Sequence, residues 1–534
     1  MSLHVNVLRD ESLPRLAWYA VVDRRAATCE VECGRFVEID PSPSPKWVVA
    51  GLWDGDFARG DFHVSEHVFG SGLRVDGEDV VVVPAHSTVD RCVYARDGEV
   101  WHVSNSLVVL LGRLGARLDG ARDHRAWGES MCLGVHNYLR QFHVVHPRFS
   151  VMSQLIFEAL HIGPAGEASY RFHDRPHEFR DFADYRAQFS GALARLWKNA
   201  TDPRRTRPMR AVGSASRGYD SSAVLSIVQP IVGTPMISWT AQKSNTRVPG
   251  VVQRLMKANL TDDDGSATAA RLGATPRYLD LEFSKIPAEL EAWCWATAQI
   301  SPELAFHALL TEADAHDVPT IFFAGHAGDG VWELGLSELM QSGQVIRGAQ
   351  SGYALIEARA RYGVVECSAP YLFSRSARAI HRVSASPEMA PWQLKNGYDR
   401  PIPRRILEEA GVPREAFGWG KKAVAADQES PQGEALRQAF FEHSRWSPLT
   451  ESLYRGVNLG LYFGGRSTTF VEHRGNRAKI VWSGRPDAKR LLSRWTDLQR
   501  RTFLMTTSWL ADRYARPADI RRAEGEPTRM AAAH

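Results

Sequence analysis

The segment that decides the fold of the second half of this chain is RAVGSASRGYDSSAVLSIV, residues 210–228. Its first residues read as a short apolar strand, and its last residues read as an apolar helix. Between them stands a turn of small and hydroxylated residues that includes Gly218 and Asp220. Backbone N–H groups at a helix N-terminus, together with hydroxyl groups, bind anions well. The segment therefore predicts a strand, an anion-binding loop and a helix.

The spacing of Gly213 and Gly218 matches a Walker A loop, but Tyr219 and Asp220 stand where that loop carries Lys and Ser or Thr. A P-loop kinase or ATPase is therefore excluded. An Asp at the mouth of an anion site is compatible with phosphate when a metal ion offsets its charge. The loop is expected to hold magnesium pyrophosphate, and a turn that only caps the helix is the alternative.

The sequence around this loop predicts a parallel sheet. From about residue 181 onward, helical segments alternate with short apolar runs such as residues 234–240 and 318–325. Such alternation favours an α/β fold with helices on both faces of the sheet and ligands at the carboxyl ends of the strands. Residues 214–222 and 324–330 both fall at such ends.

The first part of the chain has a different pattern. Up to about residue 118 it reads as strands and tight turns, with Asp97 and Gly98 placed as a hairpin turn. A longer irregular stretch from about residue 120 to 180 leads into the second half. We expect a β-rich domain over residues 1–180, an α/β domain with a helical C-terminal part over residues 181–520, and a tail over residues 521–534.

Four segments resemble one known family. SRGYDSS, residues 216–222, resembles the S-G-G-x-D-S pyrophosphate loop of N-type ATP pyrophosphatases, with Arg217 in place of Gly. IFFAGHAGDGVWELG, residues 321–335, resembles the G-x-x-x-D-E segment of asparagine synthetase-like enzymes. YGVVECSAPYLF, residues 362–373, resembles their E-x-R-x-P-F-L-D stretch, and residues 398–423 resemble their basic closing segment. The likeness spans about residues 185–425.

The resemblance implies a PP-loop fold for the second half and an Ntn-type amidohydrolase-like sandwich for the first. Family members that use glutamine carry a nucleophilic Cys directly after the initiator Met, whereas this chain has Ser2. We therefore expect the first domain to have lost glutamine hydrolysis. Two further departures, Gly330 for Glu and Phe373 for Asp, weaken any transfer of substrate identity.

The implied activity is that of an ATP-dependent, AMP-forming ligase. A substrate carboxylate attacks the α-phosphate of ATP, and an amine then attacks the acyl-adenylate, as in the related β-lactam synthetases and lasso-peptide macrolactam synthetases. Mg²⁺ is expected on Asp220 and Asp329. The residues expected to bind ATP and pyrophosphate are Ser216, Arg217, Gly218, Asp220, Ser221, Ser222, Ser238 and Gly325.

The amine must lose a proton near neutral pH, and His326 is the candidate base. It stands three residues before Asp329, where relatives with a tethered amine carry a Tyr that partners a Glu, and Glu366 is the matching acid here. Lys421 or Lys422 is expected to supply a cation for the intermediate and for the leaving AMP. An ordinary polar loop position for His326 and a solvated position for the lysines are the alternatives.

Composition limits the partners. Lys and Arg (65) nearly balance Asp and Glu (61), so no nucleic-acid partner is expected. No segment reads as a signal peptide or a membrane span, and six scattered cysteines fit reduced thiols, so a cytoplasmic location is expected. The expected substrate is a small molecule or a peptide, in the latter case with proteins that deliver it.

Three other functions remain open from the sequence. An amidotransferase fed by external ammonia would use the same adenylation chemistry. A PP-loop tRNA-modifying enzyme is a second alternative, although none of the six cysteines lies in a C-x-x-C motif or beside the loop. A non-catalytic binding subunit is the third, suggested by Arg217, Gly330 and Phe373.

Overall fold

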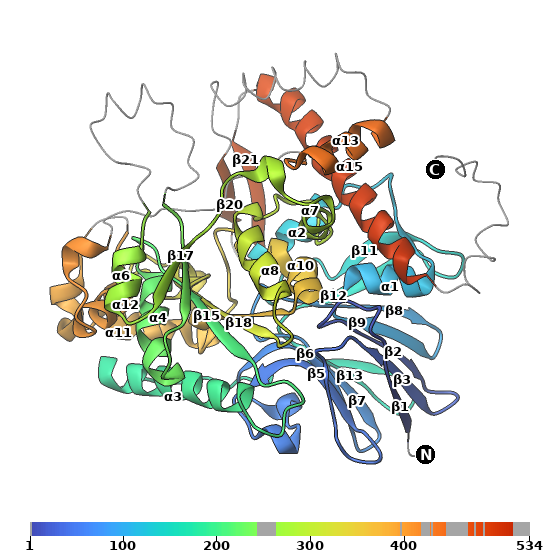
Figure 1. Ribbon diagram of the computed structural model, residues 1–534, viewed down its shortest axis with the longest axis horizontal. Coiled ribbons are helices and arrows are strands. Elements are labelled where there is room, and N and C mark those ends of the chain that lie inside the picture. The colour runs from blue at the N-terminus through green and yellow to red at the C-terminus, as the bar shows by residue number, and fades with distance from the viewer. Residues whose placement is uncertain are drawn as a thin grey trace.

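The structure is a computed structural model that describes residues 3–242, 263–395, 398–417, 428, 431–444, 468–474, 477–483 and 486–515. Over these residues the fold is mixed α/β, with two largely antiparallel sheets in the first part of the chain and a five-stranded parallel sheet in the second (Figure 1). In the same residues, no helix combines the length and apolar character that a membrane crossing needs.

The first sheet mixes one parallel pair with antiparallel neighbours, because β1 runs parallel to β3 and the other pairs are antiparallel. Gly98 adopts a φ of 63° in the turn between β8 and β9, where the sequence predicts a hairpin. The strands, in spatial order, are β1 (His4–Arg9), β3 (Thr28–Cys33), β2 (Trp18–Asp23), β9 (Val100–Ser104), β8 (Cys92–Asp97), β12 (Val151–Leu155), β11 (Gln141–Val145) and β10 (Arg117–Leu118).

The second sheet is antiparallel throughout and packs against the first. Its strands, in spatial order, are β14 (Ala168–Arg171), β13 (Ala159–Ile162), β7 (Asp79–Val83), β6 (Val68–Asp76), β5 (Trp47–Trp53) and β4 (Glu38–Ile39). Strand β5 is buried on both faces. Val48, Ala50 and Leu52 join the main core, whereas Trp47 and Trp53 belong to a separate aromatic cluster on the other face, as the two-residue period of a strand requires.

The third sheet is parallel and lies in the second half of the chain. Its spatial order is β17 (Thr275–Tyr278), β16 (Ile237–Thr240), β15 (Arg210–Ser214), β18 (Thr320–Ala324) and β19 (Val364–Ser368). Helix α4 (Asp220–Val232) packs on β15 and β18, and α3 (Phe182–Ala200) packs on α4 and on β5. In Figure 1, α3 lies below β15 and β18, while α8 (His307–Asp314) and α10 (Ile356–Tyr362) lie above them. Helices on both sides of a parallel sheet are what the alternating pattern predicts.

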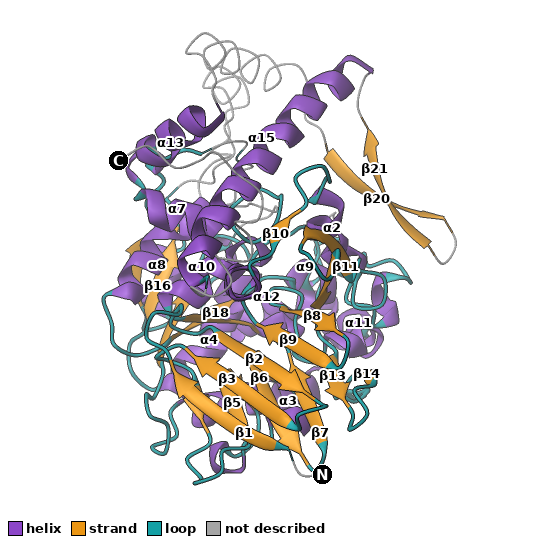
Figure 2. Ribbon diagram, turned by 90° about the vertical axis from the view of Figure 1, so that its right-hand side faces the viewer, coloured by secondary structure: helices purple, strands orange, loops and turns teal. Residues whose placement is uncertain are grey.

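The C-terminal part is mostly helical and returns to the first half. Helix α15 (Pro486–Ala511) packs against α1 (Leu107–Leu114) and α7 (Ala288–Trp295). Figure 2 shows strands of the two large antiparallel sheets, among them β1 and β7, at one end of the molecule and α13 with α15 at the other. The remaining helices and strands are α2 (Arg125–Glu129), α6 (Ser266–Arg271), α9 (Gly328–Val331), α11 (Ala377–Ala385), α12 (Pro401–Glu409), α13 (Glu434–Ser444), β20 (Thr468–Arg474) and β21 (Arg477–Ser483).

A buried carboxylate joins the two halves. Glu357 of α10 accepts hydrogen bonds from the Ser106 hydroxyl (2.6 Å) and from the Leu107 N–H (2.8 Å), both at the N-terminus of α1. Arg91 Nη2 lies 3.7 Å from the same carboxylate, and Glu357 is 0% exposed. Burial raises the pKa of Glu357, although Arg91 and these donors oppose the rise. The carboxylate therefore replaces its water shell with a helix N-terminus and a guanidinium.

We expect Glu357→Ala to lower the free energy of unfolding by about 3 kcal/mol or more, because the change leaves Arg91 buried without its partner. Urea unfolding followed by circular dichroism measures this. The matched control is Glu99→Ala, which removes an exposed pair with Arg25 at 3.4 Å and should change stability by less than about 0.5 kcal/mol. Equal losses in the two variants would show that Glu357 does not hold the halves together.

Candidate active site

The predicted strand, loop and helix are present, and the loop is held by its own hydroxyl groups. Strand β15 ends at Ser214 and helix α4 begins at Asp220. The Gly218 N–H donates to Ser216 Oγ (3.0 Å), and the Ser222 hydroxyl donates to the Ser216 carbonyl (2.8 Å). These hydrogen bonds shape the loop that leads into the first turn of α4, where a helix has backbone N–H groups without intrahelical partners.

The second predicted loop lies directly against the first. A Cβ on Gly325 would lie 2.3 Å from the Ser221 N, and a Cβ on Gly328 would lie 2.4 Å from Asp220 Cγ. Only glycine permits so close an approach. The segment that carries Asp329 is thereby packed on the Asp220 side chain, because β15 and β18 are parallel neighbours whose ends meet at one edge.

The donor set at this edge suits Mg²⁺. The two carboxylates, Asp220 and Asp329, come from the first turns of α4 and α9. Oxygen ligands of this kind, completed by substrate phosphates, are what Mg²⁺ takes in nucleotide enzymes. The residues present therefore fit a magnesium nucleotide.

A buried arginine also reaches this edge. Arg400 is 3% exposed, its Nη1 donates to Asp220 Oδ2, and its Nε donates to Glu333 Oε2 at 3.0 Å. Burial by itself would lower the pKa of Arg400, but Asp220, Tyr398 and Asp329 raise it. The guanidinium is thus within electrostatic reach of both predicted metal ligands.

The structure brings His326 and Glu366 together. His326 Nδ1 lies 2.6 Å from Glu366 Oε1, and the Ser368 hydroxyl donates to the same oxygen at 2.5 Å. Arg359 Nη1 donates to the other oxygen, Oε2, at 2.6 Å. Glu366 is fully buried in β19, whereas the His326 side chain is 17% exposed. Both carboxylate oxygens are fixed, and the imidazole is the member of the pair that solvent reaches.

The pKa values of the pair are shifted apart. Burial would raise the pKa of Glu366, but Arg359 and His326 lower it to about 2. Burial would lower the pKa of His326, but the Glu366 carboxylate raises it by its charge and its hydrogen bond. An ionised Glu366 can only accept, so Nδ1 carries the proton that it shares with the carboxylate. Nε2 is then the nitrogen that exchanges protons with a ligand.

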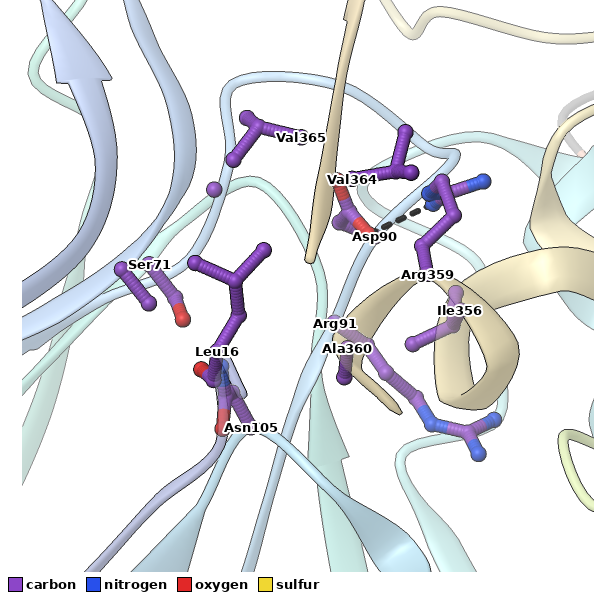
Figure 3. A pocket seen from close by; sticks show the side chains of 12 residues that line it. Leu16, Ser71, Asp90, Arg91, Asn105, Ile356, Arg359, Ala360, Val364 and Val365 are labelled. Atoms are coloured by element: carbon purple, nitrogen blue, oxygen red, sulfur yellow. Dashed lines mark hydrogen bonds and ion pairs between the residues drawn. The ribbon is translucent and has the colours of Figure 1, made fainter. Parts of the chain in front are cut away.

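Arg359 ties this pair to the first half of the chain. Its Nη2 donates to Asp90 Oδ1 (2.6 Å) and to the Val89 carbonyl (2.5 Å), and its Nη1 donates to the Gly352 carbonyl. Figure 3 shows the contact between Asp90 and Arg359, beside a cavity of about 30 Å³ that Leu16 and Asn105 also line. A cavity of this size has room for only about one or two water molecules, which is too small for a substrate.

The other predicted residues have different surroundings. Ser238 in β16 is fully buried, and its hydroxyl has no partner among the residues described. The Arg217 N–H donates to Asp263 Oδ1 at 3.2 Å. Lys421 and Lys422, and likewise Ser2, lie outside the described residues.

The two departures from the family pattern have local structural correlates. A Cβ on Gly330 would lie 3.1 Å from the Ile346 carbonyl oxygen, so any side chain there would require that carbonyl to shift by a few tenths of an ångström. Phe373 adopts a φ of 62° and packs edge-on against His67 and His177, with ring centroids 4.7 Å and 4.6 Å away. Phe373 is thus part of an aromatic contact and carries no metal-ligand chemistry.

A separate group of side chains has metal-ligand chemistry but is already engaged. Ligand atoms of Asp54, Glu66 and His67 lie within 4.8 Å of one another. Arg195 Nη2 lies 3.6 Å from Asp54 Oδ2, and His177 Nε2 contacts Glu66 Oε1. Both carboxylates therefore already have a side-chain partner, Arg195 of α3 for Asp54 and His177 for Glu66.

Sequence reasoning missed Arg400, Glu333, Arg359, Asp90 and Gly352. Arg400 stands in the basic segment that begins at Tyr398, so its charge was visible, but its contact with Asp220 was not. Glu333 lies in the segment that carries Asp329. Nothing in the sequence marks Asp90 or Gly352.

No family model and no curated protein matches the chain.

Gly352 offers a test of the His326–Glu366 pair. It has a φ of 83°, and a Cβ there would lie 2.7 Å from Glu366 Oε1 and 3.0 Å from His326 Nδ1. We expect Gly352→Ala to push the pair apart and to lower the pKa of His326, as measured by NMR titration. Gly411→Ala is the control, because Gly411 has a φ of 82° with nothing within 4 Å, so it adds backbone strain alone.

The same variant should show a pH-dependent loss of stability. A raised His326 pKa stabilises the fold fully below the unfolded value of about 6.5 and loses that effect as pH rises through the folded value. A Glu366 pKa of about 2 contributes stability that is fully present above the unfolded value of about 4.3 and is lost as pH falls from there through the folded value. Gly352→Ala should therefore lose more stability at about pH 5.5 than at about pH 9. A pH-independent loss, with an unchanged His326 pKa, would contradict the pairing.

Proposed function

We propose that the chain is an ATP-dependent, AMP-forming amide ligase that adenylates a carboxylate and joins it to an amine. The second half is then a PP-loop domain of the asparagine synthetase-like type, and the first half an Ntn-type sandwich that does not hydrolyse glutamine. One observation carries the proposal. The loops after β15 and β18 pack directly against each other. The hydrogen-bonded pair of His326 and Glu366 lies beside them at the same edge of the parallel sheet.

The first step needs a site for the negative charge of ATP. The carboxylates of Asp220 and Asp329 would hold Mg²⁺, which supplies charge neutralisation on the pyrophosphate leaving group. The N–H groups of the first turn of α4 and the hydroxyl of Ser221 donate toward the phosphates. In this step the substrate carboxylate attacks the α-phosphorus and pyrophosphate leaves.

The second step needs a base at the acyl carbon. His326 Nε2 accepts a proton from the attacking amine, and the resulting imidazolium is stabilised by Glu366 through Nδ1. Arg359 and Ser368 hold the carboxylate in place, so the pair does not have to reorganise when the charge develops. Because the pKa of His326 is raised, the fraction of neutral base should grow as pH rises through that value.

The cysteines favour this function over sulfur transfer to tRNA. All six are buried. Burial raises the pKa of each thiol, to about 12 for Cys29 and Cys33 and to about 11 for Cys132. Thiol chemistry requires the thiolate at an accessible position. External ammonia stays an alternative amine source, and comparing ammonium with a tethered amine as the nucleophile would separate the two.

We expect Asp220→Asn and Asp329→Asn each to reduce the exchange of labelled pyrophosphate into ATP by roughly 10²-fold or more, because the leaving charge loses its counterion. The carboxylate is found first by screening small acids and peptides for pyrophosphate release. Asp280→Asn is the control, since Asp280 is an exposed carboxylate just beyond β17 in the same sheet. Normal exchange in both site variants would refute the nucleotide site.

His326→Ala should act on the second step alone. Pyrophosphate exchange should persist, whereas amide formation should fall by roughly 10²-fold to 10⁴-fold, the usual contribution of a general base. The residual rate should rise with pH as more of the amine becomes neutral. His316→Ala, at an exposed histidine on the far end of α8, is the control. If His326→Ala lost exchange and ligation equally, His326 would belong to nucleotide binding or to folding.

A further inference from the structure

Arg400 lies at the edge of the parallel sheet and contacts a carboxylate through each end of its guanidinium group. Glu333 Oε1 accepts the Asp399 N–H at 2.8 Å, and Glu333 Oε2 accepts Arg400 Nε at 3.0 Å. The other end of the guanidinium, Nη1, donates to Asp220 Oδ2. A buried arginine that is held through Nε by one carboxylate and donates through Nη1 to a second is a positioned cation.

Aromatic rings fix Arg400 over the loop. Its guanidinium carbon lies 4.6 Å from the centre of the Tyr398 ring, which stacks on Tyr219 at 4.6 Å and 18°. The Tyr398 hydroxyl is 3.3 Å from the place that a Cβ on Gly218 would take. The segment from Tyr398 to Arg400 therefore covers the loop into which the phosphates are expected to bind.

This arrangement makes Arg400 and a divalent cation competitors for Asp220. An oxygen that accepts a charge-assisted hydrogen bond has less charge to offer a metal, and two cations a few Å apart repel each other strongly in a buried site. Mg²⁺ also keeps its waters unless phosphates help to replace them. Pyrophosphate oxygens relieve both costs, because they attract the guanidinium and the metal together.

We propose that Arg400 makes metal binding at Asp220 conditional on the nucleotide: the guanidinium holds off the divalent ion alone, and moves from Asp220 to the pyrophosphate oxygens when ATP brings the metal. The proposal rests on the proposed ligase function and names a further phosphate-binding residue for it. Glu333 stays bound to Arg400 Nε throughout, so only Nη1 has to change its partner. No bond is made or broken in this exchange beyond hydrogen bonds and metal ligation.

The test uses Mn²⁺ as a spectroscopic substitute for Mg²⁺, with the full chain and no carboxylate substrate. Free Mn²⁺ is followed by electron paramagnetic resonance, first with Mn²⁺ alone and then with Mn²⁺ and inorganic pyrophosphate. Arg400→Gln should bind Mn²⁺ alone about 10-fold more tightly than wild type, and Mn²⁺-pyrophosphate about 10-fold more weakly, as the loss of one close charge contact implies. A variant that only disturbed the structure would weaken both affinities, whereas the proposed role predicts that the affinity for Mn²⁺ rises while the affinity for Mn²⁺-pyrophosphate falls.

Two further variants complete the test. Arg405→Gln is the matched control, because Arg405 lies in α12, which begins directly after Arg400, and is engaged by Glu409 (2.7 Å) and Glu388 (3.1 Å). It should match wild type in both titrations. Arg400→Lys keeps the charge but cannot reach Glu333 and Asp220 with two separate nitrogens, and should shift both affinities in the same directions as Arg400→Gln by about 3-fold. It decides the question if Arg400→Gln does not fold.

The Asp220→Asn variant separates the role of Arg400 from the existence of the metal-nucleotide site itself. Asp220→Asn should abolish the binding of Mn²⁺ to the protein in both titrations, so that the free Mn²⁺ signal equals that of the same solution without protein. If binding depends on Asp220 but neither Arg400 variant differs from wild type, the role of Arg400 is refuted and the nucleotide site stands. If Asp220→Asn changes neither titration, the metal does not bind there and both proposals fall.

Discussion

The site depends on one constraint, the adjacency of β15, β18 and β19 in a parallel sheet. Parallel neighbours end at the same edge, so the loops that follow them must share the space there. Glycine at 325 and 328 removes the side chains that would keep the first two loops apart. His326 and Glu366, 40 residues apart, meet because β18 and β19 are paired with Phe322 opposite Glu366. The order of the strands in the sheet therefore brings these side chains together.

The charges at this edge are arranged for function more than for stability. Buried ion pairs contribute little net stability, because desolvation offsets their attraction. Here Arg359 serves Glu366 and Asp90, and Arg400 serves Glu333 and Asp220. Each guanidinium is 3% exposed and spans two carboxylates from different segments. Such pairs fix the direction of a charge, which is what a site needs when it stabilises charges that appear during a reaction.

Much of the fold and part of the site could be predicted from the sequence. The alternation of apolar runs and helices indicated the parallel sheet, and local composition around Asp220 indicated the strand, loop and helix. The contact of His326 with Glu366 was expected from the resemblance to a family in which the corresponding positions are paired. What could not be predicted were contacts between distant segments, such as Arg400 with Asp220 and Arg359 with Asp90. These depend on how helices α10 and α12 pack, and neither has a local sequence signal for its partner.

The first half of the chain acts on the site without contributing a reacting group. Asp90 and the Val89 carbonyl fix Arg359, Arg359 fixes one oxygen of Glu366, and Glu366 fixes Nδ1 of His326. Glu357, two residues before Arg359 on α10, binds the N-terminus of α1, so the helix is tied to the first half at two points. The first half is thus the support that holds this chain of charged contacts in place. That dependence gives a physical reason for the two halves to share one continuous core.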